Sequence, residues 1–213
     1  MKKILSIDDH RIIAMGLETL TQKFDKGIAI GHAANFVEAL RSLKNEKWDL
    51  IMLDISLKGK SGLDILKEIK SIYPKIPVLM FSLLNNVEFV RRSLKLGASG
   101  YVTKDSPEEE ISDAIRKVLG KGHYVSKDVA ENLIFAPESI THGGLSGREF
   151  EILVKIGEGK TVKEIAAELF LSENTVETYR SRIKEKMNMK RDAELIRYCV
   201  AAKLVNVDFP ETA

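Results

Sequence analysis

Residues 50–62 read Leu-Ile-Met-Leu-Asp-Ile-Ser-Leu-Lys-Gly-Lys-Ser-Gly. The first four are apolar without alternation, a pattern typical of a strand that is buried on both faces of a parallel sheet. Asp54 follows the last of them directly, and an amphipathic helical pattern covers about 62–72. This stretch therefore predicts a strand and a helix, with a carboxylate at the end of the strand.

The same pattern recurs through the first 120 residues, in short apolar runs at 4–7, 28–34, 78–81 and 100–102. Helical patterns follow these runs, at about 11–22, 36–45, 86–96 and 107–119. Parallel strands need a helical crossover between them, so five such units predict an α/β fold. We expect a doubly wound, five-stranded parallel sheet with helices on both faces over residues 1–120.

After residue 120 the alternation of predicted strands and helices stops. Residues 121–144 contain Pro137 and the pair Gly143-Gly144, and we expect them to form a linker between two domains, with a short linker helix in the apolar stretch Val129–Phe135. Residues 145–213 show no strand pattern, and a small all-α domain of four helices is expected there. The helices are predicted at about 146–157, 161–169, 173–187 and 191–203, with capping boxes Ser146-x-x-Glu149 and Thr161-x-x-Glu164 at the first two.

Composition narrows the functional classes. The 213 residues carry 33 basic and 31 acidic side chains, which excludes a highly charged disordered chain and nucleic-acid binding by bulk charge alone. The single cysteine, Cys199, excludes a disulfide scaffold, and the four histidines show no metal-ligand spacing. No apolar run has the roughly 18 residues of a membrane helix, and Asp8 follows the N-terminus too closely for a signal peptide. We therefore expect a soluble, cytoplasmic protein.

Polar side chains follow four of the five predicted strands. In an open parallel sheet, ligands bind beyond the carboxyl ends of the strands. These ends carry Asp8-Asp9, Asp54, Ser82 and Thr103-Lys104. Three carboxylates at one edge repel one another and need a cation, and oxygen ligands with room for water suit Mg²⁺. A carboxylate beside Mg²⁺ and a lysine can attack a phosphoryl donor and become an aspartyl phosphate. Any one of these acids alone would be an ordinary loop residue.

Residues 2–120 resemble the receiver domain of bacterial response regulators, which has a flavodoxin-like fold. Asp8-Asp9, Ser82, Lys104 and the run Leu53-Asp-Ile-Ser-Leu-Lys-Gly-Lys-Ser-Gly62 carry the resemblance. It implies that Asp54 is the phosphoacceptor and that Mg²⁺ is held by Asp8, Asp9, Asp54 and the main-chain carbonyl of Ser56. It also implies catalytic or switch roles for Lys104, Ser82 and Tyr101. The family usually has proline at the position of Lys58.

The same resemblance implies how the switch works. Ser82 moves toward a phosphoryl group on Asp54, and Tyr101 rotates into the vacated space. This change would bias the face formed by the helices at 86–96 and 107–119, so that the domain dimerises or releases the second domain.

A phosphatase of the haloacid dehalogenase type also forms a phosphoaspartate. It needs a second aspartate two residues later as its general acid and base, and this chain has Ser56 there. We therefore expect no enzyme activity beyond phosphorylation and dephosphorylation of Asp54 itself.

The third helix of the C-terminal domain carries a concentrated positive charge. Between Thr178 and Arg191 there are six basic residues and one acidic residue, whereas 145–205 as a whole has 12 basic and 10 acidic. Such a patch suits phosphates, and the tight turn at 170–172 predicts a helix-turn-helix whose second helix enters the major groove. Helical spacing predicts a core-facing side made of Val176, Tyr179, Ile183 and Met187.

Residues 145–205 resemble the LuxR-type helix-turn-helix domain. The matching motifs are Leu145-Ser-Gly-Arg-Glu-x₃-Leu153, Gly157-x-Gly159, Lys163-Glu-Ile-Ala166, Leu169-x-Leu-Ser172 and Thr175-Val176. A receiver followed by this domain is the architecture of the NarL/FixJ subfamily of two-component response regulators.

The LuxR-type resemblance also implies which residues bind DNA. Base edges would be approached by Glu177, Thr178 and Ser181, and phosphates by Thr161, Lys163, Thr175, Arg182 and Lys186, with Asn174 on the same outward face. Lysine is usual in the family at the position of Glu177, and histidine at that of Tyr179.

The last helix leaves two interpretations open. Leu195, Tyr198, Cys199 and Ala202 either pack inside the domain or, as in the family, form a two-fold dimer contact that reads two half-sites one helical turn apart.

Three functions follow from these observations. The first is a transcription factor whose DNA binding is controlled by a sensor histidine kinase through Asp54, active as a homodimer. The second is an orphan regulator that binds DNA without phosphorylation, and the intact acidic edge argues against it. The third uses the helix-turn-helix for a protein partner such as RNA polymerase. Glu177 favours this third function, and the positive patch disfavours it.

Overall fold

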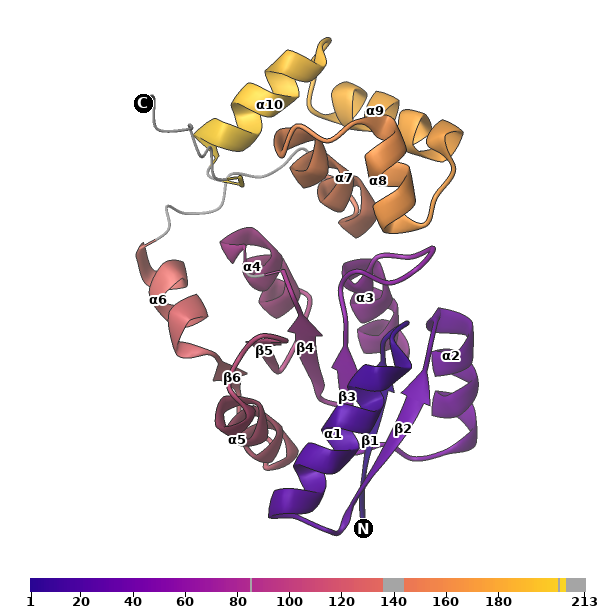
Figure 1. The fold of residues 1–213 in the computed structure, drawn as a ribbon, viewed down its shortest axis with the longest axis vertical. Coiled ribbons are helices and arrows are strands. Elements are labelled where there is room, and N and C mark those ends of the chain that lie inside the picture. The colour runs from indigo at the N-terminus through magenta and orange to yellow at the C-terminus, as the bar shows by residue number, and fades with distance from the viewer. Residues whose placement is uncertain (85, 136–143, 203, 206–213) are drawn as a thin grey trace. The chain divides into compact units, whose positions relative to one another are not determined.

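The computed structural model describes residues 1–84, 86–135, 144–202 and 204–205. The chain divides into two compact units, Met1–Ala136 and Pro137–Ala213, and each is described by itself (Figure 1). No helix in the described part of the chain is both long and apolar enough to cross a membrane.

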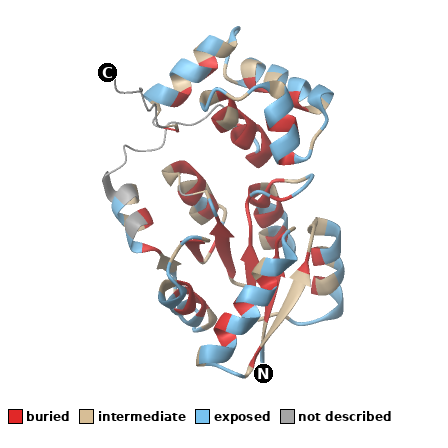
Figure 2. Cartoon of the chain, in the orientation of Figure 1, coloured by how far each residue is buried: buried red, intermediate tan, exposed pale blue. Residues whose placement is uncertain are grey.

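The first unit is built on a parallel sheet with strand order β2-β1-β3-β4-β5-β6. The strands are β1 (Lys2–Ile7), β2 (Ile28–Ala33), β3 (Leu50–Leu53), β4 (Val78–Ser82), β5 (Gly100–Thr103) and β6 (Tyr124–Val125). Every residue of β3, β4 and β5 is buried, because these strands lie inside the sheet and are covered on both faces (Figure 2). The predicted parallel α/β fold is therefore confirmed.

The sixth strand corrects the prediction of a five-stranded sheet. Tyr124 and Val125 of β6 pair with Gly100 and Tyr101 of β5. Glycine permits this approach, since a Cβ atom at position 100 would lie 2.3 Å from the carbonyl oxygen of Tyr124. A strand of two residues has too few side chains to produce a recognisable pattern in sequence.

The predicted linker over 121–144 needs a related correction. The expected helix forms as α6 (Lys127–Phe135), but it packs against α4 (Val87–Lys95) and buries Val129, so it belongs to the first unit. The backbone N–H of Ser126 donates to the carbonyl of Tyr101, so this segment is joined to the sheet. The first compact unit thus extends through Ala136. Positions 136–143 of the predicted linker lie outside the described residues.

Helices cover both faces of the sheet (Figure 1). One face carries α1 (Arg11–Phe24) and α5 (Glu108–Leu119), and their apolar side chains share one core with residues of the strands. The other face is covered by α2 (Phe36–Asn45), α3 (Gly62–Ile72) and α4, which carry buried stripes of their own. This layering leaves the carboxyl ends of the strands as the edge where polar side chains gather.

The second unit confirms the predicted all-α domain of four helices. They are α7 (Gly147–Gly157), α8 (Val162–Leu169), α9 (Glu173–Lys186) and α10 (Asp192–Ala201). Both predicted capping boxes form, at Ser146 with Glu149 and at Thr161 with Glu164. Helix α7 is buried along most of its length and packs against α9 and α10.

Candidate functional site

The carboxyl ends of the strands of the first unit carry Asp8, Asp9 and Asp54, and we call this side of the sheet the acidic edge. A lysine lies at its centre. Asp8 follows β1, Asp54 follows β3 and Lys104 follows β5, so the parallel strands bring the three side chains together. The Lys104 Nζ atom lies 2.7 Å from a carboxylate oxygen of Asp8 and 2.7 Å from one of Asp54. Burial by itself would lower the pKa of Lys104, but the two carboxylates outweigh it and raise that pKa. The lysine therefore stays charged and holds the two carboxylates in place.

The loop after Asp54 folds back on the strand end. The backbone N–H of Ser56 donates to Oδ1 of Asp54 at 3.3 Å, and that of Gly62 donates to the carbonyl of Ile55 at 2.7 Å. A Cβ atom at position 62 would lie 2.0 Å from the main-chain oxygen of Asp54. Position 62 therefore requires glycine, and this close contact fixes the backbone that carries Asp54.

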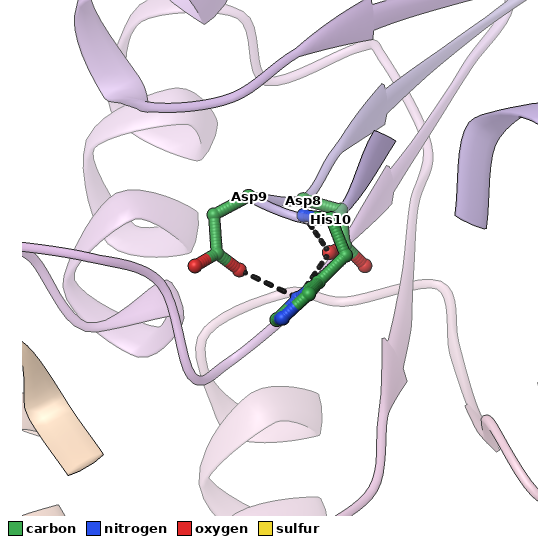
Figure 3. A group of neighbouring side chains, drawn as sticks. All are labelled: Asp8, Asp9 and His10. Carbon is green, nitrogen blue, oxygen red and sulfur yellow. Dashed lines mark hydrogen bonds and ion pairs between the residues drawn. The ribbon is translucent and has the colours of Figure 1, made fainter. Parts of the chain in front are cut away.

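A second group at the same edge comprises Asp8, Asp9 and His10 (Figure 3). The Nδ1 atom of His10 lies 2.9 Å from Oδ1 of Asp9 and 3.4 Å from Oδ1 of Asp8. One ligand atom from each of the three residues lies within 4.8 Å of the others, so the fold places His10 beside two carboxylates although the four histidines show no metal-ligand spacing in sequence. Lys58 adds a cation, with its Nζ atom 3.5 Å from Oδ2 of Asp9.

The acidic edge fits a divalent cation. The Asp9 side chain is 4% exposed, and among the described residues its buried Oδ1 atom meets only the exposed His10 imidazole, at 2.9 Å. A buried anionic oxygen in this state is costly unless a cation satisfies it. With Asp8 and Asp54, it forms a set of oxygen donors of the kind that hard cations prefer.

The two predicted switch residues, Ser82 and Tyr101, both bind Leu84. The Ser82 Oγ atom accepts from the N–H of Leu84 at 3.4 Å, and the Tyr101 hydroxyl donates to the carbonyl of Leu84. Burial, and then the negative charge of Asp54, raise the pKa of Tyr101 well above its usual range. Leu84 leaves no signal in the sequence, because it contributes only its main chain to these contacts.

The second unit contains a helix-turn-helix formed by α8 and α9. Phe170 adopts a left-handed conformation with φ of 53°, and the N–H of Leu171 donates to the carbonyl of Ala166, which closes the end of α8. Ser172 then caps α9 by accepting from the N–H of Thr175. On the inner side of α9, Val176 and Ile183 are buried as predicted, and Tyr179 and Met187 are half-buried.

Most of the residues predicted to bind DNA are exposed. Thr175 is half-buried, and the exposed set is Thr161, Lys163, Asn174, Glu177, Thr178, Ser181, Arg182 and Lys186. Thr161 and Thr175 also take part in the caps of α8 and α9. The Arg182 guanidinium lies 5.9 Å from the ring centre of Tyr179.

The positive patch on α9 is partly neutralised inside the domain. Arg180 pairs with Glu177 and Asp192, and Lys184 pairs with Asp192 at 2.9 Å. Lys186 lies 2.6 Å from Glu149 at the start of α7. Counting charges along residues 178–191 did not include these acidic partners, so the charge predicted from sequence is too high.

The contact between Lys186 and Glu149 lowers the pKa of the Glu149 carboxyl group. Burial of Glu149 would raise its pKa, but the Lys186 ammonium and the hydrogen bonds from Ser146 outweigh burial and lower it. Lys186, predicted to contact phosphate, therefore already has an anionic partner within the domain.

Burial along helix α10 excludes two of the four predicted residues from a dimer contact. Leu195 and Cys199 are completely buried, and the Cys199 thiol donates to the carbonyl of Leu153, so neither is available for a dimer contact. Burial raises the pKa of Cys199 to about 12. Tyr198 and Ala202 are half-buried, whereas Ile196 and Val200 are the exposed large apolar side chains of this helix.

Comparison with known proteins gives two matching families. Residues 4–116 match the response regulator receiver domain, and residues 144–199 match the luxR family of bacterial regulatory proteins.

Relatives match over nearly the whole chain. The oxygen regulatory protein NreC of Staphylococcus epidermidis is 32% identical over 215 residues, 95% of this chain and 99% of NreC. The transcriptional activator protein ExaE of Pseudomonas putida is 30% identical over 210 residues, 96% of this chain and 98% of ExaE. The crystal structure of a LuxR-family two-component response regulator from Aurantimonas is 29% identical, with a TM-score of 0.58 over 62% of this chain and 94% of that one.

Proposed function

Because this chain belongs to the two-component response regulators of the NarL/FixJ subfamily, in which a receiver domain precedes a LuxR-type DNA-binding domain, we propose that phosphorylation of Asp54 controls its binding to DNA. The observation that carries the proposal is the position of Lys104, 2.7 Å from both Asp8 and Asp54. A cation at this place meets the oxygens of an incoming phosphoryl group next to the carboxylate that attacks it.

Asp54 acts as the nucleophile. One of its carboxylate oxygens forms a bond to phosphorus, while the bond from phosphorus to the donor breaks and its electron pair leaves with the donor. The donor is a phosphorylated sensor histidine kinase or a small acyl phosphate. Lys104 then exchanges its contact with Asp54 for a phosphoryl oxygen, and the contact with Asp8 keeps its ammonium in position.

Asp8, Asp9, Asp54 and the main-chain carbonyl of Ser56 would hold Mg²⁺, and the buried Oδ1 atom of Asp9 supports this set. Bound Mg²⁺ supplies positive charge against the phosphoryl oxygens. Lys58 provides a further cation 3.5 Å from Asp9, at a position where the family usually has proline.

Leu84 physically connects the two proposed switch residues, Ser82 and Tyr101. Ser82 and Tyr101 bind its N–H and its carbonyl respectively. When Ser82 turns to donate to a phosphoryl oxygen, it leaves the N–H of Leu84, and the loop that holds the Tyr101 hydroxyl is released. The change reaches α4, whose first residue is three positions after Leu84.

The second unit is proposed to bind double-stranded DNA through α9. Glu177, Thr178 and Ser181 face base edges, while Thr161, Lys163, Thr175 and Arg182 face phosphates, with Asn174 beside them. Exposure of these side chains, apart from half-buried Thr175, supports the assignment. A homodimer would use Tyr198 and Ala202 together with Ile196 and Val200 of α10, and it would act in the cytoplasm.

The domain bounds follow from these assignments. The receiver is proposed to extend through α6, since the first compact unit ends at Ala136. The DNA-binding domain is proposed to span 145–213.

The test is the intact mass of the full chain after incubation with Mg²⁺ and acetyl phosphate. Wild type is expected to gain one phosphoryl group, and Asp54→Asn is expected to gain none. Asp105→Asn, which removes an exposed carboxylate beside Lys104, is the matched control and is expected to be labelled like wild type. No labelling of wild type, under conditions that label another receiver, would favour the orphan regulator.

DNA binding of the labelled and unlabelled protein then tests the coupling. We expect the two forms to differ in affinity by a factor that corresponds to ~1–3 kcal/mol. Equal affinities would contradict control by phosphorylation.

A further inference from the structure

The side of α9 that is proposed to face the bases presents hydrogen-bond acceptors. The Thr178 hydroxyl donates to the main-chain carbonyl of Asn174 at 2.9 Å, and the Ser181 hydroxyl donates to that of Glu177 at 3.1 Å. Because these donors are used inside the helix, the two hydroxyl oxygens offer only lone pairs to a ligand, and the Glu177 carboxylate is an acceptor only. These side chains therefore need donors on the DNA.

The major groove offers few groups of this kind. The base donors there are the amino groups N4 of cytosine and N6 of adenine. Adenine presents the acceptor N7 beside its amino group, which repels a carboxylate, whereas cytosine presents its amino group without such an acceptor on the same base. We propose that Glu177 reads a cytosine in the DNA site. The inference rests on the proposed DNA binding, because it names the base that α9 selects.

Arg180 holds the Glu177 carboxylate in position. Its Nη1 atom lies 2.6 Å from Oε1 of Glu177, and its Nη2 atom contacts Asp192 at the start of α10. Lys184 contacts the same aspartate at 2.9 Å. The Arg180 side chain is 18% exposed, so its rigid fork is fixed against α10 and orients Glu177 in turn. In this arrangement Oε2 of the exposed Glu177 side chain is the acceptor for the base.

The same contacts make a carboxylate tolerable next to DNA. Glu177 and Asp192 contribute two negative charges, and Arg180 and Lys184 contribute two positive charges, so the network is neutral as a whole. A neutral network meets less repulsion from the phosphates than an unpaired carboxylate would. Arg180 is therefore a positioning residue for the base contact of Glu177.

The experiment selects binding sites from DNA with a random central segment, using the full chain treated with Mg²⁺ and acetyl phosphate. Glu177→Gln is the test variant, because it keeps the length of the side chain and adds a donor. Glu185→Gln is the matched control, since Glu185 is an exposed glutamate about two turns further along α9. We expect wild type and Glu185→Gln to enrich cytosine at a position where Glu177→Gln enriches adenine, because glutamine pairs with both N6 and N7 of adenine.

The role of Arg180 is tested by discrimination between two DNAs. The affinity of wild type for the selected site should fall about fivefold or more when that cytosine is replaced by thymine, which has an acceptor in place of the amino group. Arg180→Met is expected to reduce this ratio, and Arg180→Lys to restore part of it, because lysine can still contact one carboxylate. Weaker binding of Arg180→Met to both DNAs with an unchanged ratio would overturn the positioning role.

The outcomes separate this inference from the proposed function. A wild-type chain that enriches a sequence whose base preferences are unchanged in Glu177→Gln, or changed equally in Glu185→Gln, contradicts the base assignment alone. Enrichment of another base at the position that depends on Glu177 also contradicts it. A wild-type chain that enriches no sequence contradicts the proposed DNA binding, and the base assignment falls with it.

Discussion

The ammonium of Lys104 lies 2.7 Å from a carboxylate oxygen of Asp54, and this contact joins the end of β5 to the end of β3. The two residues are 50 positions apart in sequence. The Lys104 side chain is 9% exposed and that of Asp54 5%, so water screens the pair weakly. The contact offsets part of the negative charge of the acidic edge.

Replacing Lys104 by methionine is expected to destabilise the first unit, because it leaves buried carboxylates without their cation. The loss should be about 3 kcal/mol, and Mg²⁺ should restore part of it. Urea unfolding followed by the fluorescence of Trp48 measures this, since the chain has one tryptophan and it lies in the first unit. Lys23→Met, which breaks only an exposed ion pair with Glu108, is the control and should have a small effect. Equal losses in the two variants would contradict the prediction.

Tyr101→Phe is expected to lower the stability of the first unit by about 1 kcal/mol, because the carbonyl of Leu84 loses its donor. Tyr73→Phe, at a half-buried tyrosine, should change it less. Urea unfolding followed by the fluorescence of Trp48 measures the stability of both variants.

The alkaline titration of Tyr101 gives an independent check. Its pKa is raised above the ordinary value of 10.0 by burial and by Asp54, so the stability that depends on the neutral phenol is present below pH 10 and is lost as the pH rises further. Folded wild type and Tyr101→Phe should therefore show the same rise in phenolate absorbance near pH 10. A larger rise in wild type would show that Tyr101 ionises in the folded state.

Phe170→Asn is expected to stabilise the second unit by up to about 1 kcal/mol, because Phe170 is in the left-handed region, which asparagine tolerates better. The side chain is 58% exposed, so little packing is lost. Phe170→Ala keeps the backbone cost and should not stabilise. The reactivity of the Cys199 thiol in urea reports on this unit, because the chain has one cysteine and it is buried. A gain for alanine equal to that for asparagine would contradict the backbone explanation.

Arg182→Gln and Lys186→Gln should change different properties, namely DNA binding and domain stability respectively. Arg182→Gln is expected to reduce the slope of log affinity for DNA against log salt by about 0.9, with unchanged stability. Lys186→Gln is expected to leave the slope unchanged and to destabilise the domain, because Glu149 loses its partner. If Lys186→Gln reduces the slope as much as Arg182→Gln, Lys186 contacts DNA after all.

The pH dependence of stability also distinguishes Lys186→Gln from Arg182→Gln. The pKa of Glu149 is lowered from 4.5, so its contribution to stability is present above pH 4.5 and is lost as the pH falls through the lower value in the folded state. Lys186→Gln should reduce this acid-side loss, whereas Arg182→Gln should not. Cys199 reactivity measured between neutral and acidic pH provides the comparison.

Sequence alone determined the features that depend on local patterns. Unbroken apolar runs, such as Leu50–Leu53, predicted the buried strands, because strands inside a parallel sheet need apolar side chains on both faces. The position of Asp8, Asp54 and Lys104 directly after such runs then predicted the acidic edge, since parallel strands end at the same edge. Helix spacing and capping boxes predicted the four C-terminal helices.

Only the tertiary structure decided which of these side chains meet and which are hidden. It turned the His10 imidazole toward Asp9, bound Ser82 and Tyr101 to the main chain of Leu84, and paired Lys186 with Glu149, which is 37 residues away. It also buried Leu195 and Cys199, which helical spacing alone could not separate from the exposed Ile196 and Val200. The physical reason is that periodicity describes one element at a time, whereas charge pairing, main-chain contacts and burial depend on the neighbours that the fold brings together from distant parts of the chain.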